Sequence, residues 1–227
     1  MSEVLDQLQQ VSDRIGLLGD GLRALAHALE GEPTPAPSPV SNGVILRVPY
    51  HSQHEADAQW FRKDCGPACV EAIGKYFSPT ASASTNEIMQ HITRGVDRST
   101  YTRELCAAAG HFFDVDLDRT EGNDWDDLMG WLDEGRPSVV LVHYGSFGLR
   151  MDRGWTGGHF MVVCGWDRID YQGETIERVI VHDPDWYGDA MAQGAFIPVI
   201  KGHFMGTWDD AYKDGNPQRL ALVQRSA

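Results

Sequence analysis

The sequence predicts an α+β domain, with helices in its first half and a mostly antiparallel sheet in its second half, preceded by a separate helix. Three observations support this: heptad-spaced apolar residues at the N-terminus, helical apolar spacing between residues 64 and 109, and short strand-like apolar runs after residue 138. Helices followed by strands with short connections are typical of α+β domains. We therefore expect a helical half packed on a sheet, with a cleft between them.

The first 30 residues carry apolar side chains at alternating steps of four and three. These positions are Val4, Leu8, Val11, Ile15, Leu18, Leu22, Leu25 and Leu29. A seam sustained over about four heptads predicts a coiled-coil helix and a homo-oligomer formed through residues 1–30. Gly16, Gly19 and Gly21 each weaken an isolated helix by about 1 kcal/mol, so it would need contacts with a partner. The alternative is a helix that folds back onto its own domain.

Residues 31–43, GEPTPAPSPVSNG, have the Pro, Gly and Ser composition of a semi-rigid linker. The main domain is therefore expected to span residues 44–227. Its predicted elements are, in order, a strand at 44–48, helices at 64–76, 85–92 and 100–109, a strand at 111–117, a helix at 124–132, and strands at 138–143, 159–166 and 179–182.

Composition excludes several classes of partner. The chain has 19 basic and 33 acidic residues and a net charge of −14, which argues against nucleic-acid binding. No stretch approaches the roughly 20 apolar residues of a membrane span, and the N-terminus lacks signal-peptide character. We therefore expect a cytoplasmic protein, with release by a non-classical route left open.

The four cysteines, Cys65, Cys69, Cys106 and Cys164, are too few and too scattered for a disulfide framework. We expect all four to be reduced thiols. The sequence contains no Cys-x-x-Cys pairs that could form a zinc site, so it predicts neither a metal nor a cofactor.

Residues 63–70, KDCGPACV, place a cysteine at the expected start of a helix. Asp64 is a residue type that caps helices, and Pro67 fits a first turn because the first amides have no intrahelical partner. At that position the free amides and the helix dipole stabilise a thiolate, so Cys65 is the candidate nucleophile. Cys69, one turn later, is expected to be a buried core residue.

Two further segments contain candidate partners for this cysteine. In GGHFMVVCGW, residues 157–166, His159 opens a strongly apolar strand behind a glycine-rich loop. In VIVHDP, residues 179–184, Asp183 ends a strand before a proline. A histidine facing a helix-borne cysteine can activate the thiol, and an aspartate can fix the imidazole tautomer. Taken singly, His159 would more often be a structural histidine, and an Asp-Pro at the end of a strand is just a turn signal.

In the order Cys, His, Asp, these segments resemble the papain-like cysteine peptidases related to the leader-peptidase domains of bacteriocin exporters and their stand-alone bacterial and phage relatives. The resemblance spans roughly residues 44–223 and includes VPYHSQ at residues 48–53. It implies a papain-like fold in which Cys65 attacks a carbonyl carbon, His159 acts as acid and base, and Asp183 orients His159.

The resemblance also implies an oxyanion-stabilising glutamine upstream of the cysteine. Gln53 is favoured because its Val-Pro-Tyr context matches the stand-alone relatives. Gln59 is the second candidate, because it lies six residues before Cys65. The sequence leaves this choice open.

The leading hypothesis is a cysteine endopeptidase acting on a protein or on cell-wall peptides. The main alternative is a non-catalytic structural or binding module that retains the peptidase fold and is oligomerised by its N-terminal helix. A third hypothesis is amide hydrolysis or acyl transfer on a small molecule, because a nucleophile and a base do not fix the substrate. No transmembrane stretch or phosphate-binding loop is present in the sequence, so leader-peptide cleavage coupled to export is not expected.

Overall fold

The computed structural model describes residues 43–55, 63–96, 98–148, 156–171 and 174–226. The chain falls into two units, Met1–Ser41 and Asn42–Ala227. All described residues belong to the second unit. The predicted N-terminal coiled-coil helix, all but the last residue of the predicted linker, and Gln59 lie outside the described residues.

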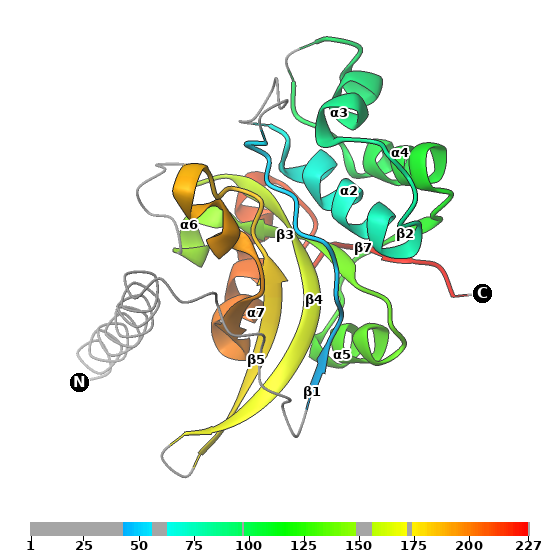
Figure 1. The fold of residues 1–227 in the computed structure, drawn as a ribbon. Coiled ribbons are helices and arrows are strands. Elements are labelled where there is room, and N and C mark those ends of the chain that lie inside the picture. The colour runs from blue at the N-terminus through cyan, green and yellow to red at the C-terminus, as the bar shows by residue number, and fades with distance from the viewer. Residues whose placement is uncertain (1–42, 56–62, 97, 149–155, 172–173, 227) are drawn as a thin grey trace. The chain divides into compact units, whose positions relative to one another are not determined.

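Within these ranges, seven strands form one antiparallel sheet (Figure 1). The strands are β1 (Gly43–Ile45), β2 (Leu117–Thr120), β3 (Ser138–His143), β4 (Gly158–Tyr171), β5 (Glu174–His182), β6 (Ile197–Ile200) and β7 (Ala221–Gln224). Their order is β2-β7-β3-β4-β5-β6, and β1 pairs with β4 beyond the part that pairs with β3. Because β1 runs antiparallel to β4, the chain after β1 heads toward the first residues of β4.

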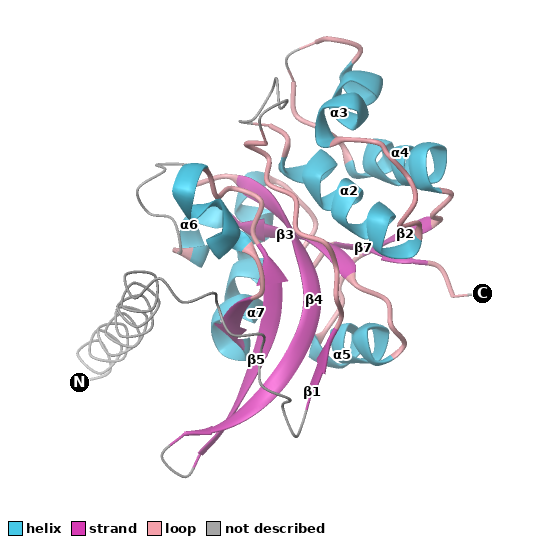
Figure 2. Ribbon diagram, viewed as in Figure 1, coloured by secondary structure: helices cyan, strands magenta, loops and turns pink. Residues whose placement is uncertain are grey.

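Helices lie on both sides of the strands (Figure 2). They are α2 (Cys65–Phe77), α3 (Thr85–Thr93), α4 (Thr102–Phe113), α5 (Trp125–Asp133), α6 (Tyr144–Phe147) and α7 (Lys201–Asp209), with 3-10 helices η2 (Gly188–Gly194) and η3 (Asp210–Asp214). None of the helices in the described ranges is long and apolar enough to cross a membrane.

Strand alternation divides the interior into two apolar cores. Leu141 and Phe160 face a first core shared with α2, α3 and α4, whereas Val140 and Met161 face a second core shared with α5, α6 and α7. Successive side chains of a strand point to opposite faces, so near-continuous apolar runs such as SVVLVH fit a sheet that is covered on both faces. The fold is thus α+β as predicted, with helices on both faces of the sheet.

Local signals account for the starts of two helices. Ser84 and Glu87 form a capping box at the start of α3, and Asp124 and Asp127 form one at the start of α5. Each pair satisfies two backbone amides that have no intrahelical partner. These helices begin within one residue of their predicted positions.

The strand predicted at 111–117 is wrong over most of its length. Residues up to Phe113 belong to α4, which ends where Asp114 adopts a left-handed backbone conformation with φ 56°. Leu105, Ala109 and Phe113 recur at helical spacing and are buried in the first core, so tertiary packing extends the helix. The strand proper begins at Leu117.

Strands β4 and β5 continue further than predicted and form a long hairpin that is visible in Figure 1. Its register is supported by a two-bond pair between the Arg178 guanidinium and Asp167, at 2.8 and 2.6 Å, and by Arg168 Nη2 donating to Glu177 Oε1 at 2.9 Å.

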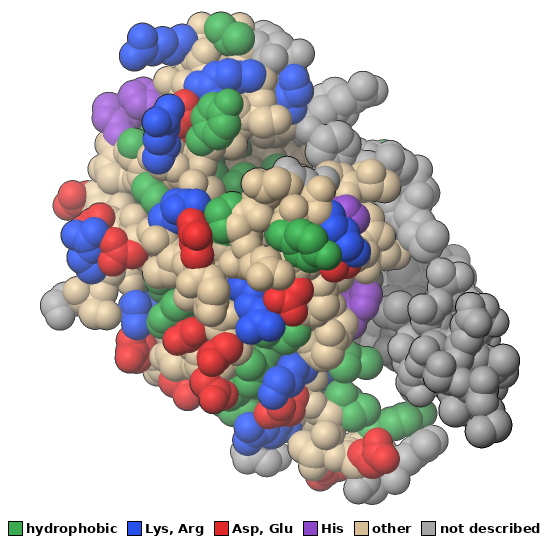
Figure 3. Space-filling model, turned by 180° about the vertical axis from the view of Figure 1, so that it is seen from behind, with side chains coloured by type: hydrophobic (Ala, Val, Ile, Leu, Met, Phe, Trp, Pro, Cys, Tyr) green, Lys and Arg blue, Asp and Glu red, His purple; other side chains and the backbone are tan. Residues whose placement is uncertain are grey.

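Acidic and basic side chains are interspersed on the face of the molecule shown in Figure 3.

Candidate active site

Helix α2 begins at Cys65, at the predicted helix start. The Asp64 side chain makes no capping hydrogen bond, contrary to the expected cap, and the first helical bond runs from Ala68 N to Asp64 O at 2.9 Å. The Asp64 carboxylate therefore does not cap the first turn of α2. The backbone amides of that turn are the groups that would stabilise a negative charge on Cys65. Cys65 is partly exposed, whereas Cys69 is buried as predicted.

The start of α2 packs closely against the segment leading into α4. A Cβ atom at Gly66 would lie 2.9 Å from Thr100 Oγ1 and 3.0 Å from Leu105 Cδ1. Glycine at this position therefore permits the close approach that sets the position of the neighbouring Cys65.

His159, the second residue of β4, donates from Nε2 to Asp183 Oδ1 at 2.8 Å. The pairing of Val162 with His182 places Asp183, the residue after β5, beside the start of β4. His159 and Asp183 are only 3% and 0% exposed. Cys65 lies near enough to His159 for its side chain to raise the pKa of the imidazole, so the structure brings the three predicted residues into one neighbourhood.

Opposing effects act on the His159 imidazole. Burial disfavours its charged form, but hydrogen bonds to Asp183 and Cys65, with the negative charges of both groups, outweigh burial and raise the pKa of His159 to about 10. His159 therefore holds its proton at neutral pH. Because Nε2 is bound to Asp183, Nδ1 is the ring nitrogen available to the sulfur of Cys65.

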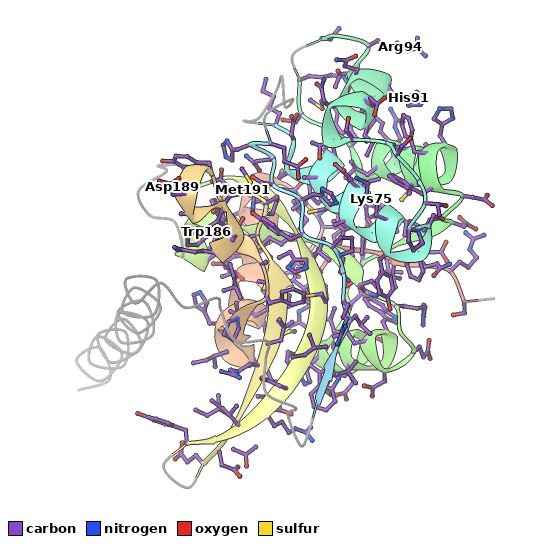
Figure 4. All side chains as sticks on the ribbon, in the orientation of Figure 1. Lys75, His91, Arg94, Trp186, Asp189 and Met191 are labelled. Atoms are coloured by element: carbon purple, nitrogen blue, oxygen red, sulfur yellow. The ribbon has the colours of Figure 1, made fainter. Side chains whose placement is uncertain are left out.

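Within the described part of the chain, the Asp183 carboxylate receives four hydrogen bonds. Oδ1 accepts from His159 Nε2 and, at 3.0 Å, from Asp185 N, while Oδ2 accepts from Tyr144 Oη at 3.0 Å and Trp186 Nε1 at 3.2 Å. Figure 4 shows Trp186 on the segment that leads into η2. Saturated in this way, the carboxylate has one orientation and fixes the plane of the imidazole. Sequence reasoning assigned Tyr144 no role, and its only signal is its position directly after a predicted strand.

The Asp183 backbone is held as firmly as its side chain. Tyr50 Oη donates to Asp183 O at 3.1 Å, and Asp183 N donates to Gly194 O at 2.9 Å. A Cβ atom at Gly194 would lie 2.2 Å from Tyr50 Oη, so this contact requires glycine. The Val-Pro-Tyr segment thus lies against the residue that orients His159.

Gln53 lies in the same region of the structure. Its backbone N donates to Pro184 O at 2.9 Å, and its side-chain Nε2 donates to Asp185 Oδ1 at 3.2 Å. Gln53 is 5% exposed, so its amide is held within the fold. Gln59 is not among the described residues, and the choice between the two glutamines stays a prediction.

A cavity of about 360 Å³ opens beside the start of β4. Its lining combines apolar and polar residues, and includes Thr100, Leu141, Gly158, Phe160, Asn216 and Leu220. Gly158 directly precedes His159, and Thr100 is the residue that Gly66 approaches. The cavity therefore borders the neighbours of both the cysteine and the histidine.

His51, Glu55 and Glu71 bring three potential metal-ligand atoms within 4.8 Å of one another. Glu71 Oε1 also accepts from Lys75 Nζ, and its Oε2 accepts from the backbone N and Oγ1 of Thr85, both at 2.6 Å. The Lys75 ammonium therefore already supplies a positive charge to Glu71. Through its bonds to Thr85, Glu71 joins helix α2 to the start of helix α3, and we interpret the group as structural.

Comparison with known proteins gives the family and the fold of the chain. A family model described as the Peptidase_C39 like family matches residues 45–215. A C39-like peptidase from Bacillus anthracis aligns with a TM-score of 0.55 and 14% identity, over 82% of this chain and 99% of that one. UfSP from C. elegans aligns with a TM-score of 0.48 and 12% identity, over 86% of this chain and 36% of that one.

None of the curated proteins matches the chain. At 14% identity, the likeness to the Bacillus anthracis structure shows the fold, whereas the family match extends over most of the chain. The chain therefore belongs to the Peptidase_C39 like family and is a cysteine peptidase.

Proposed function

We propose that the chain is an endopeptidase in which Cys65 is the nucleophile, His159 the acid and base, Asp183 the residue that orients His159, and Gln53 an oxyanion donor. The observation that carries the proposal is the buried His159 imidazole, which is hydrogen-bonded to Asp183 and whose pKa is raised by both Asp183 and Cys65. Nucleophile, base and orienter in contact are the requirement for covalent catalysis by a thiol.

The first half of the reaction forms a thioester. The Cys65 thiolate attacks the peptide carbonyl carbon, and the carbonyl oxygen becomes an oxyanion that accepts hydrogen bonds from Gln53 Nε2 and the Cys65 backbone N–H. His159 then transfers its Nδ1 proton to the amine nitrogen as the carbon–nitrogen bond breaks. The amine leaves, and the acyl group stays on the sulfur.

The second half releases the acid. Neutral His159 takes a proton from a water molecule, whose oxygen attacks the thioester carbon. The carbon–sulfur bond breaks, and Cys65 returns to a thiolate beside protonated His159. Asp183 keeps Nε2–H donating throughout, so Nδ1 always faces the reacting atoms.

The cavity that Gly158 lines, next to His159 in the chain, has room for a side chain of an extended peptide. Its lining mixes apolar residues, such as Leu141 and Phe160, with polar ones, such as Asn216, as is usual for ligand sites. Protein or cell-wall peptides are the substrate classes we propose.

Alkylation by iodoacetamide across pH, with mass spectrometry to locate the adduct, tests the proposed nucleophile. Cys106 is an internal reference, because it is also partly exposed while burial, followed by the charge of Asp118, raises the pKa of its thiol. We expect Cys65 to react faster than Cys106 at neutral pH, and to lose this advantage in His159→Ala. The peptidyl epoxide E-64 should label the same cysteine.

Equal reaction of Cys65 and Cys106, or an unchanged Cys65 rate in His159→Ala, would contradict the proposed catalytic pair. The non-catalytic binding module would then be the better description of this chain.

A further inference from the structure

The segment containing Gln53 is attached by hydrogen bonds to the turn after Asp183. Ser52 Oγ donates to Trp186 O at 2.5 Å and to Pro184 O at 3.2 Å, and Gln53 N donates to Pro184 O at 2.9 Å. Residues about 130 positions apart in the sequence are thereby fixed side by side. The position of the Gln53 backbone thus depends on the turn that carries Asp183.

The Asp185 carboxylate is at the centre of this attachment. Its Oδ1 accepts from Gln53 Nε2 at 3.2 Å and pairs with His54 Nε2 at 2.7 Å. Its backbone N donates to Asp183 Oδ1 at 3.0 Å. Asp185 is 5% exposed, so it contacts both proposed catalytic side chains, Gln53 and Asp183, inside the fold.

A carboxylate next to a glutamine amide decides which end of the amide faces it. The two ends have nearly the same shape, but only Nε2 donates hydrogen bonds. An ionised carboxylate only accepts, so a flipped Gln53 would set Oε1 against Asp185 Oδ1 at hydrogen-bond distance and the two oxygens would repel. Asp185 therefore selects the amide orientation in which Nε2 lies at the turn.

Orientation matters because an oxyanion requires a donor. The Nε2 group carries two N–H bonds in one plane, and fixing one of them on Asp185 sets the direction of the other. Donors held in place before the reaction stabilise the oxyanion most, since they need no reorganisation during it. His54 places a ring nitrogen on the same carboxylate oxygen and supports its position.

We propose that Asp185 is a positioning residue of the active site, which holds the Gln53 amide with Nε2 directed for the oxyanion while its backbone holds Asp183. The proposal rests on the proposed function, in which Gln53 is the oxyanion donor. The turn Asp183-Pro184-Asp185 then fixes the orientation of both the base, His159, and the oxyanion donor, Gln53. A shift of this turn would disturb both orientations together.

Two reagents acting on the full chain separate this role from a general structural one. With p-nitrophenyl acetate, the Cys65 sulfur bonds to the acetyl carbon through an oxyanion, the carbon–oxygen bond breaks, and p-nitrophenolate leaves. Iodoacetamide reacts by displacement of iodide at a saturated carbon and forms no oxyanion. The phenolate released by Cys65→Ala is subtracted as background.

In Asp185→Asn, the new amide can donate to Gln53 Oε1, so the flipped orientation becomes acceptable. We expect the rate of Cys65 acylation to fall about 10- to 100-fold, which approaches the effect of removing one oxyanion donor. The rate of alkylation should stay within about twofold. Gln53→Ala should show the same selective loss. The double variant Gln53→Ala with Asp185→Asn should lose little more, because both changes remove one function.

Asp189→Asn is the matched control, because this exposed carboxylate lies in η2 of the same segment (Figure 4) and its replacement removes the same charge. Both rates should be unchanged in it. If Asp185→Asn does not fold, as judged by circular dichroism, Asp185→Ala replaces it, with the same selective loss expected.

Unchanged acylation in the Asp185 variants, or an equal loss of both reactions, would overturn the role of Asp185. Additive losses in the double variant would also overturn it. If Cys65 of the unaltered protein reacts no faster than Cys106 with iodoacetamide, the failure is instead that of the proposed function.

Discussion

At the scale of single residues, the proposed catalytic chemistry depends on the positive charge of His159, which burial alone would remove. His159 is enclosed by the fold, yet hydrogen bonds and the charges of Asp183 and Cys65 keep it protonated, with a pKa of about 10. An unperturbed imidazole has a pKa of about 6.5. The stabilisation that His159 gives the folded state is therefore fully present below about pH 6.5, and is lost as the pH rises through about 10.

Asp183→Asn tests the origin of this charge. Asparagine can still accept from His159 Nε2 but carries no negative charge, so the pKa of His159 should fall by about 1–2 units. In the proposed mechanism protonated His159 donates to the leaving amine, so we expect the alkaline loss of activity to move to lower pH by a similar amount. Titration of the imidazole by NMR in both proteins measures the shift directly. An unchanged His159 pKa would exclude Asp183 as the main cause of the raised pKa.

At the scale of elements, the active site depends on how helix α2 packs against α4. Gly74 is buried in α2, and a Cβ atom there would lie 2.3 Å from Cγ of Phe113 in α4. A glycine inside a helix costs about 1 kcal/mol relative to alanine, so helix propensity alone favours replacing it. Overpacking of a core costs about 1–3 kcal/mol, and the clash involves a buried aromatic ring.

We therefore expect Gly74→Ala to destabilise the protein by roughly 1–2 kcal/mol, because overpacking exceeds the gain in helix propensity. The control is Gly130→Ala in α5, where an added Cβ has no neighbour within 4 Å. There the gain in propensity should remain, at up to about 1 kcal/mol. Urea unfolding of both variants measures the two changes. A stabilised Gly74→Ala would mean that Phe113 moves aside at little cost.

At the scale of the whole molecule, the heptad seam in residues 1–30 predicts an oligomer of peptidase domains. Glutamates at Leu8 and Leu22, two positions on the seam, would bury charges between paired helices. We expect the double variant Leu8→Glu with Leu22→Glu to be a monomer by light scattering, whereas the unaltered chain is larger. Alkylation of Cys65 should persist, because the residues proposed for catalysis lie in the second unit.

Gln10→Glu with Ala24→Glu is the matched control, because these positions lie away from the seam and should leave the assembly intact. A monomeric unaltered chain would favour the alternative in which the helix folds back onto its own domain.

The sequence by itself determined the fold class, the start of α2 at Cys65, and the candidate residues His159 and Asp183. These features have local causes: a glycine-proline pair in a first helical turn, apolar runs of strand length, and an Asp-Pro dipeptide after a strand. Local sequence also placed α3 and α5, since their capping boxes lie within four residues.

Only the tertiary structure decided what surrounds these residues. The contacts of Tyr144 and Trp186 with Asp183, and of Asp185 with Gln53, arise from the packing of distant segments, and no local pattern encodes them. Packing of Phe113 in the first core likewise extended α4 through the residues predicted as a strand. Propensity and spacing act over a few residues, whereas the orientation of the Gln53 amide depends on which segments the fold brings together.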